Sequence, residues 1–212
     1  MSGEGELDLG SADKRRTLWI VLWLNVAIAL GFFAVGYFAD SNALLANGLD
    51  NSSDAIVYAL SLLALTRSRT WKRGAARFSG VMLLVFAGGV IADAIRRFVE
   101  GSEPGGIMMI AMAAVAAGVN LICLRLLRKM KAKDVNLRAA TTFSFNDFIS
   151  NGGIIIAGIV VMLTGANWPD LAVGIAVACI AIYGGIDILR DTHMDTHEED
   201  GTEHRTGDEF GR

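Results

Sequence analysis

Long apolar blocks divide this sequence, and they limit its fold more than any other feature. Each block is about 20 residues long, which is the length that an α-helix needs to cross the hydrocarbon core of a membrane. Hydrophobic residues make up 53% of the 212 residues and charged residues make up 19%. Backbone inside lipid must satisfy its own hydrogen bonds, so we expect these blocks to be helices.

We predict an all-α fold in which six transmembrane helices form one bundle. The predicted spans are residues 17–40, 42–66, 78–98, 106–127, 137–163 and 170–189. Residues 1–16 then form an N-terminal segment, 17–192 the transmembrane domain and 193–212 an acidic tail. The tail has too few apolar residues to fold alone, so we expect it to be disordered.

The distribution of Lys and Arg predicts how the bundle is oriented. Basic residues gather in three segments, which are residues 14–16, 67–77 and 125–138. Since cytoplasmic loops carry an excess of Lys and Arg, this pattern places both termini in the cytoplasm. Arg96 and Arg97 are exceptions at the outer end of the third span. We therefore predict a multi-pass protein of the cell membrane, which is the inner membrane if the source is bacterial.

Asp50, Asp54 and Asp147 lie well inside apolar spans, where a charge costs on the order of 2.5–3.5 kcal/mol on insertion scales. Asp50 and Asp54 are one helical turn apart and share a helix face. Asp54 is roughly 18 Å from the outer end of its span, and Asp147 is roughly 15 Å from the inner end of its own. All three are therefore predicted to lie near the middle of the membrane.

This arrangement of carboxylates suits a transported cation. A divalent cation between two dry carboxylates removes their repulsion, and protons can do the same when the cation leaves. Three carboxylates with an open fourth position can form such a site. The structural alternative is that they pair with Lys or Arg, or cap a kink near Gly48, but no basic residue lies in the middle of any span.

The remaining polar features predict less. Asn25, Asn120 and Asp93 also lie inside spans, and we expect them to pack and hydrogen-bond between helices. All three histidines are in the tail, where a weak metal-collecting role competes with simple solvation. The sequence has no phosphate-binding loop, no nucleophile and base pair, and no basic face for nucleic acid. It is therefore not predicted to be an enzyme, and no prosthetic group is expected.

Several motifs resemble those of the cation diffusion facilitator family of metal/proton antiporters. The run from Leu44 to Asp54, LLANGLDNSSD, is similar to the family pattern LLAD…(H/D)xxxD. The segment that begins Asn136-Leu137-Arg138-Ala139-Ala140 is similar to LNLRAAxLHVLGDALGSVG, and Asp93 to Phe98 is similar to EAIxRL. The likeness covers about residues 15–192.

The resemblance implies efflux of a divalent metal by alternating access, driven by inward proton flow. In its register, Asp50, Asp54 and Asp147 fall on metal ligands. The family favours Zn²⁺ as cargo, Cd²⁺ is an alternative, and an all-oxygen site also suits Mn²⁺ and Fe²⁺.

This chain also departs from the family pattern. Phe143 stands at the first ligand position of the fifth span and cannot coordinate a cation. Asn151 and Asn47 are therefore predicted either as additional ligands or as residues that contact the ligands. A basic loop, residues 128–133, replaces the histidine-rich loop of many members. Only about 20 residues follow the last span, so the family's cytoplasmic domain is expected to be absent. A homodimer would then be held within the lipid by contacts between transmembrane helices.

Two other functions remain open on the sequence. The chain would be a regulatory or structural membrane partner of a fuller transporter if the change at Phe143 has removed activity. It would be an organic-cation carrier if its carboxylates receive an ammonium group. Activity that depends on coexpression favours the first alternative, and transport of an organic cation with no response to zinc favours the second.

Overall fold

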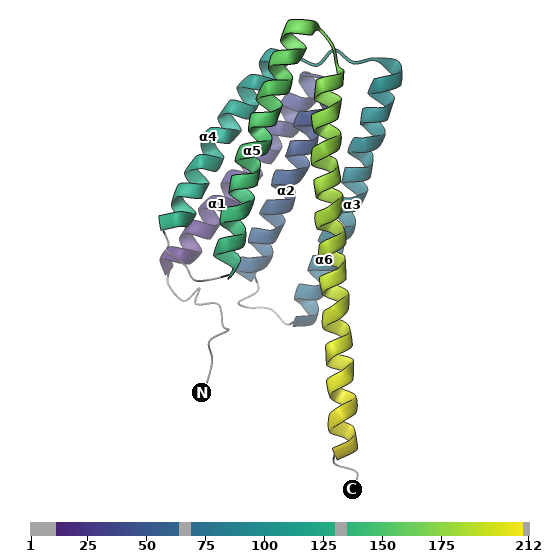
Figure 1. The fold of residues 1–212 in the computed structure, drawn as a ribbon. Helices are drawn as coiled ribbons and strands as arrows, with labels where there is room; N and C mark the ends of the chain where they lie inside the picture. The colour runs from purple at the N-terminus through teal and green to yellow at the C-terminus, as the bar shows by residue number, and fades with distance from the viewer. Residues whose placement is uncertain (1–11, 64–68, 130–134, 210–212) are drawn as a thin grey trace.

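The computed structural model describes residues 12–63, 69–129 and 135–209, and within them it contains helices and no strands. The helices are α1 (Ala12–Phe38), α2 (Asn42–Leu63), α3 (Arg69–Glu100), α4 (Gly106–Lys129), α5 (Val135–Thr164) and α6 (Trp168–Glu209). They run up and down in one bundle (Figure 1), so the predicted all-α, six-helix fold is confirmed.

The helices divide into a group of four and a pair. Helices α1, α2, α4 and α5 pack together, whereas α3 packs along α6 at one side of the bundle (Figure 1). Helix α2 contacts α1, α3, α5 and α6, so it joins the two parts. The α1–α2, α3–α4 and α5–α6 connections lie at one end of the bundle, which we name the loop end, and the opposite end is the terminal end.

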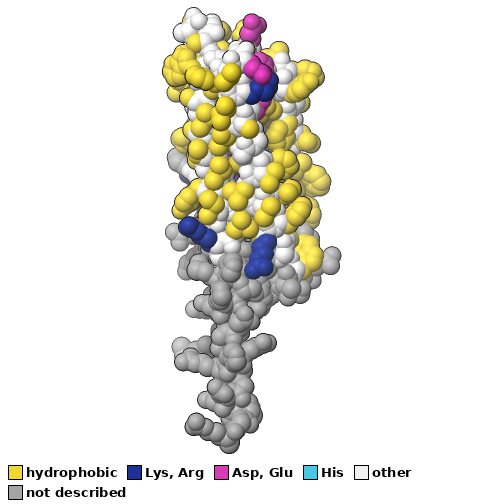
Figure 2. All heavy atoms as spheres, turned by 90° about the vertical axis from the view of Figure 1, so that its right-hand side faces the viewer, with side chains coloured by type: hydrophobic (Ala, Val, Ile, Leu, Met, Phe, Trp, Pro, Cys, Tyr) yellow, Lys and Arg dark blue, Asp and Glu magenta, His cyan; other side chains and the backbone are white. Residues whose placement is uncertain are grey.

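Five helices are long and apolar enough to cross a membrane. Their membrane-crossing segments are Arg15–Phe38, Gly74–Glu100, Gly106–Arg128, Asn146–Thr164 and Trp168–Arg190. Exposed apolar side chains cover the middle of the face in Figure 2, and charged side chains gather near both ends of the described surface. This pattern is that of a multi-pass membrane protein.

Helix α2, with 22 residues, is the shortest of the six described helices and is not among these five. The run Asp50-Asn51-Ser52-Ser53-Asp54 lowers its hydropathy. Four other helices surround it, and Asn51 and Asp54 are buried. Its polar face therefore packs against protein, which is where polar residues at membrane depth are tolerated.

Apolar packing fills the four-helix group near both of its ends. Near the loop end, one core cluster includes Phe32, Leu44, Met109 and Ile154. Near the terminal end, a second cluster includes Leu18, Val21, Tyr58, Leu62, Cys123 and Leu127. The buried polar residues Asn25, Asn51 and Asn120 lie between these two clusters along α1, α2 and α4.

Helix α6 continues beyond the bundle into the segment after residue 192. It remains helical to Glu209, and its last part stands clear of the other helices (Figure 1). Nucleating a helix is unfavourable but extending one is easy, so a helix already formed in residues 168–190 can propagate into a polar segment.

Candidate metal centre

The polar face of α2 carries two of the predicted ligands. Asp54 is four residues after Asp50 on α2. On the same side of the helix, Asn51 lies between them and Asn47 lies about one turn nearer the loop end. Asn47, Asn51 and Asp54 are buried, and Asp50 is partly buried. The Asn51 side-chain amide donates a 2.9 Å hydrogen bond to the Asn47 carbonyl of its own helix. The local sequence thus aims a row of oxygen atoms at the interior of the bundle.

Helix α5 supplies the third carboxylate. Asp147 is 3% exposed, and Asn151 lies one turn further along the same face. The Asn151 side chain donates to the Asp147 carbonyl at 2.8 Å, and the Asn47 side chain donates to Asn151 Oδ1 at 3.1 Å. The two asparagines predicted as additional ligands therefore contact each other and connect α2 to α5.

The three carboxyl groups are neighbours. The Asp50 and Asp147 carboxyl groups lie within hydrogen-bonding reach of each other, and Asp54 lies within electrostatic range of both. Two carboxyl groups in such contact must share a proton or a cation. In the described part of the chain, however, no group of three or more His, Cys, Asp or Glu side chains is close enough to hold a metal ion. The carboxyl groups must therefore approach further before all three can bind one cation.

Several buried polar atoms in this region have no hydrogen-bond partner among the described residues. Together with Asn42 Oδ1 near the loop end, they are Asn25 Oδ1, Asn47 Oδ1, Asn51 Oδ1, Asp54 Oδ2, Asn120 Nδ2, Asn120 Oδ1 and Asp147 Oδ2. Buried polar groups in proteins are nearly always hydrogen-bonded, so a concentration of exceptions indicates a functional region. We name Asn25, Asn47, Asp50, Asn51, Asp54, Asn120, Asp147 and Asn151 the mid-bundle layer.

The structure corrects one prediction about polar residues and leaves three untested. Asn25 donates to Val21 of its own helix and Asn120 has no side-chain partner, so neither makes the expected hydrogen bond between helices. The side chains of Phe143 and of the tail histidines are not among those that the structure describes. The roles of the three aspartates as ligands stay predictions.

A second polar region lies at the loop end, where Asp170 of α6 binds the first turn of α2. Asp170 is fully buried, and its carboxylate accepts from Ser41 Oγ at 2.5 Å and from the backbone N–H groups of Asn42 at 2.7 Å and Ala43 at 3.1 Å. Ser41 Oγ in turn accepts from the Leu44 N–H at 3.2 Å. A carboxylate from another helix thus satisfies the free N–H groups at the start of α2.

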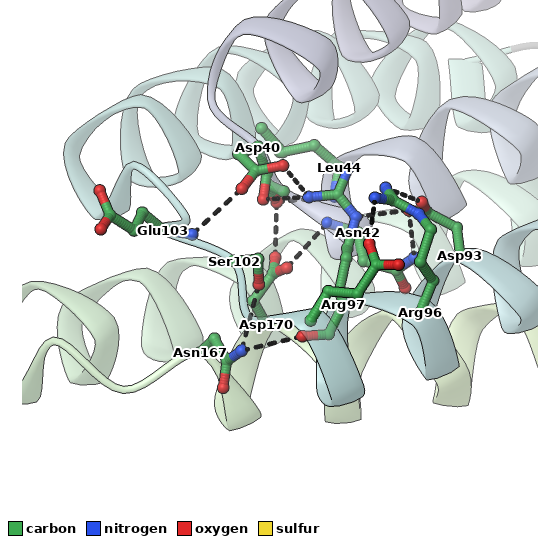
Figure 3. A network of polar contacts seen from close by, with 12 residues as sticks. Asp40, Asn42, Leu44, Asp93, Arg96, Arg97, Ser102, Glu103, Asn167 and Asp170 are labelled. Atoms are coloured by element: carbon green, nitrogen blue, oxygen red, sulfur yellow. Dashed lines mark hydrogen bonds and ion pairs between the residues drawn. The ribbon is translucent and has the colours of Figure 1, made fainter.

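Arg97 is the cation of this region (Figure 3). Its guanidinium is buried, donates to Asp93 Oδ2 at 2.5 Å, and bonds both the carboxylate and the backbone carbonyl of Asp40. Asn42 Nδ2 donates to Asp93 at 3.2 Å, and the Glu103 N–H donates to Asp40 at 3.0 Å. These bonds connect the α1–α2 turn, α3 and the α3–α4 connection.

We name this region the end network, and it consists of Asp40, Ser41, Asn42, Asp93, Arg96, Arg97, Ser102, Asn167 and Asp170. Asp170 and Asn42 were not predicted as functional residues from the sequence, and Arg97 was an exception to the charge pattern. The signal that could have found them is Asp40-Ser41-Asn42, three consecutive residues with capping side chains directly before an apolar helix.

Comparison with known proteins gives a family. The cation efflux transmembrane domain matches residues 18–194. The chain is 25% identical to the "Cadmium, cobalt and zinc/H(+)-K(+) antiporter" of Bacillus velezensis, over 90% of this chain and 65% of that protein. It is 28% identical to the zinc transporter ZitB of Escherichia coli, over 78% of this chain and 58% of that protein. With the metal cation efflux system protein CzcD of Cupriavidus metallidurans, it shares 24% identity over 82% of this chain and 59% of that protein.

The chain thus spans about three fifths of the length of these relatives. The match to the family domain nevertheless covers nearly all of the six helices and the whole mid-bundle layer. On this match, the chain belongs to the cation efflux family, a family of membrane transporters.

Proposed function

We propose that this chain exports a divalent transition-metal cation across the membrane in exchange for protons. Asp50, Asp54 and Asp147 would hold the cation, with Asn47 and Asn151 beside them as further oxygen donors. The observation that carries the proposal is that three neighbouring carboxyl groups lie within the bundle and make no ion pair with a Lys or Arg of the described residues.

Electrostatics explains why a cation would bind there. Taking carboxylates out of water without an opposite charge is strongly unfavourable, and their mutual repulsion adds to this cost. A divalent cation offsets both terms, and the approach of the three carboxyl groups that binding requires becomes favourable only when it is present. The site is thereby expected to change shape between its loaded and unloaded states.

Protons provide the exchange partner. When a cation with two positive charges leaves, uptake of two protons by the carboxylates keeps the charge of the site constant. When a new cation enters, those two protons are released. If the cation leaves on one side of the membrane and the next one enters on the other, the inward movement of protons drives the outward movement of metal.

The nature of the cargo follows from the donors and the relatives. Carboxylate and amide oxygens accept Zn²⁺ and also favour harder cations such as Mn²⁺ and Fe²⁺. The relatives are named for zinc, cadmium and cobalt, so we propose Zn²⁺ first, then Cd²⁺ and Co²⁺. The basic segments of the sequence support cytoplasmic termini, which makes the transport direction outward from the cytoplasm. We also propose a homodimer held through the transmembrane helices.

The test is metal-driven proton movement in proteoliposomes that contain only the purified protein and a pH-sensitive dye. We expect a saturable signal with Zn²⁺ that is absent in Asp54→Asn. Asp187→Asn serves as the matched control, because Asp187 is an exposed carboxylate on α6. Loss of the signal in both variants would contradict the site assignment. A folded wild-type protein that gives no signal with any divalent metal would contradict autonomous transport and favour the partner or organic-cation alternatives.

A further inference from the structure

The inward faces of α1 and α4 are apolar except for one amide each. On α4 the buried residues include Met109, Ala113, Ala116, Asn120, Cys123 and Leu127. On α1 they include Leu18, Val21, Asn25, Ile28 and Phe32. Asn25 and Asn120 are each 1% exposed, so a leucine of similar volume would suit either position if packing were the only requirement.

The contacts between α4 and α5 place Asn120 at the depth of Asp147. A Cβ on Gly158 would lie 3.1 Å from Met109 Cβ, which fixes the register of this antiparallel pair. Antiparallel helices rise equally, so counting the same number of residues from this contact along each helix reaches a common depth. Asn120 lies eleven residues after Met109 on α4, and Asp147 lies eleven residues before Gly158 on α5, so the two are at the same depth. The Cys123 thiol, one turn from Asn120, also lies within electrostatic range of Asp147.

The same reasoning places Asn25 beside Asn120 in depth. A Cβ on Gly31 would lie 2.9 Å from the end of the Met112 side chain, which fixes the register of α1 against α4. Asn25 lies six residues before Gly31 on α1, which is the depth of residue 118, six residues after Met112 on α4. Residue 118 is two residues from Asn120, or about 3 Å along the axis.

Helix α2 comes near the same depth with Asp54. A Cβ on Gly48 of α2 would lie 3.1 Å from the Phe33 ring of α1. Asn25 lies eight residues before Phe33, which is the depth of residue 56, eight residues after Gly48. Residue 56 is again about 3 Å along the axis from Asp54. The two offsets run in the same direction, so Asn120 and Asp147, then Asn25, then Asp54 follow one another within about 6 Å along the axis. The two amides lie on the α1 and α4 side of the carboxyl groups.

Their hydrogen bonding shows that they do not serve packing. Asn25 Oδ1 has no partner among the described residues, and neither side-chain atom of Asn120 has one. A buried amide without partners destabilises the fold, and an apolar side chain of the same size avoids that penalty. The two amides are thus arranged for a ligand that brings its own hydrogen-bonding groups.

We propose that Asn25 and Asn120 form a hydration subsite for the cation held by Asp50, Asp54 and Asp147. Their amide oxygens accept hydrogen bonds from water molecules in the coordination sphere of the cation. The subsite favours hard divalent cations that keep water ligands, such as Mn²⁺, over softer cations that shed them, such as Cd²⁺. This inference rests on the proposed function.

The test compares Asn120→Leu with wild type in two measurements on the full chain in detergent. The first is the thermal unfolding midpoint without added metal, and the second is the Kd of Mn²⁺ and of Cd²⁺ by titration calorimetry. We expect Asn120→Leu to raise the unfolding midpoint, since it removes unsatisfied groups. We expect the Kd of Mn²⁺ to rise on the order of 10–100-fold, the range for groups that hold a metal's outer ligands, and that of Cd²⁺ to rise less. Asn25→Leu should act in the same direction.

Matched variants make the test decisive. Asn167→Leu removes an amide that donates to Arg97 and Ser102 of the protein. It should lower the unfolding midpoint and leave both Kd values unchanged. If Asn120→Leu does not fold, Asn120→Ser and Asn120→Ala replace it, and only Ser, which still bonds water, should keep Mn²⁺ binding near wild type.

Two results would overturn parts of the argument separately. Wild-type binding of Mn²⁺ and Cd²⁺ with no change in Asn120→Leu would overturn the hydration subsite alone, as would equal losses for the two metals. Absence of binding of any divalent cation to the folded wild type would overturn the proposed function as well.

Discussion

The end network and the mid-bundle layer are both buried and polar, but they satisfy their polar groups differently. In the end network, Arg97 bonds two carboxylates, and Asp170 accepts from three donors at the start of α2. In the mid-bundle layer, seven buried side-chain atoms have no partner among the described residues, against one, Asn42 Oδ1, in the end network.

Under the proposed function, the difference separates a structural polar region from the region that binds the cation. A network in which every charge has a partner holds its helices in one arrangement. A layer with unsatisfied carboxyl and amide groups is unfavourable in this arrangement and becomes favourable only when a ligand enters. Changes in the end network should therefore reduce stability, whereas changes in the mid-bundle layer should reduce function and spare or increase stability.

The largest loss of stability is expected for Arg97→Met. The change removes the one buried cation of the end network and leaves Asp40 and Asp93 without it. Breaking a buried ion pair by removing one partner typically lowers the free energy of unfolding by about 3–5 kcal/mol. Because Asp40 is half exposed, we expect about 3 kcal/mol, measured by denaturant unfolding in detergent.

Arg96→Met is the control for that prediction. Arg96 is the neighbouring residue and also pairs with Asp93, at 2.7 Å, but its side chain is 54% exposed. Exposed ion pairs contribute about 0–1 kcal/mol, so stability should be nearly unchanged. Equal losses in the two variants would show that burial of Arg97 does not decide the strength of the end network.

A smaller loss is expected for Asp170→Asn. The amide can keep its oxygen at the Oδ1 position, where Ser41 and Ala43 donate, but its NH₂ group then faces the N–H donor of Asn42. Losing charge-assisted hydrogen bonds should lower the free energy of unfolding by about 2 kcal/mol. The measurement is again denaturant unfolding, and metal-driven proton flux in proteoliposomes should persist. A fully stable variant would show that Asp170 does not anchor α2.

Gly174→Ala tests the approach of α6 to α2 at the same end. A Cβ on Gly174 would overlap Asn42 Oδ1, so the helices must separate. Such overpacking typically lowers stability by about 1–3 kcal/mol. Gly184→Ala on the same helix meets nothing within 4 Å and should be neutral or stabilising. Unfolding midpoints of the two variants give the comparison, and a neutral Gly174→Ala would contradict tight packing there.

Asp54→Asn makes the same chemical change as Asp170→Asn in the other polar region and should have the opposite effect on stability. It removes a buried carboxylate that lies near Asp50 and Asp147 and lacks a cation partner. We expect stability to stay constant or rise by about 1 kcal/mol, while metal-driven proton flux is lost. A large loss of stability together with retained flux would reverse the roles of the two regions.

The mid-bundle layer could be predicted from the sequence because its signal is local. Asp50 and Asp54 share a face through a spacing of four residues, and Asp147 stands out as a charge in an apolar span. Helical periodicity then brings these residues to similar depths. The hydrogen bond from Asn47 to Asn151 joins the two asparagines that were predicted on the same reasoning.

The end network could not be predicted in this way, because its partners are far apart in the sequence. Ser41 and Asp170 are 129 residues apart, and Asn42 and Asp93 are 51 apart. Such pairs depend on which helices become neighbours, and hydropathy does not specify that. The structure also accounts for Arg97, which the loop-charge pattern could not place, because it is buried among carboxylates and does not act as a loop charge.

The smallest effect is expected for removal of residues 193–212. The membrane-crossing part of α6 ends at Arg190, and the helix beyond it stands clear of both polar regions (Figure 1). The unfolding midpoint and the maximal metal-driven flux should therefore equal those of the full chain. The informative measurement is flux at limiting metal concentration, because His193 and His197 lie in the removed segment. A loss confined to low metal would give the tail a metal-collecting role, whereas a loss at all concentrations would mean that the mid-bundle layer does not work without it.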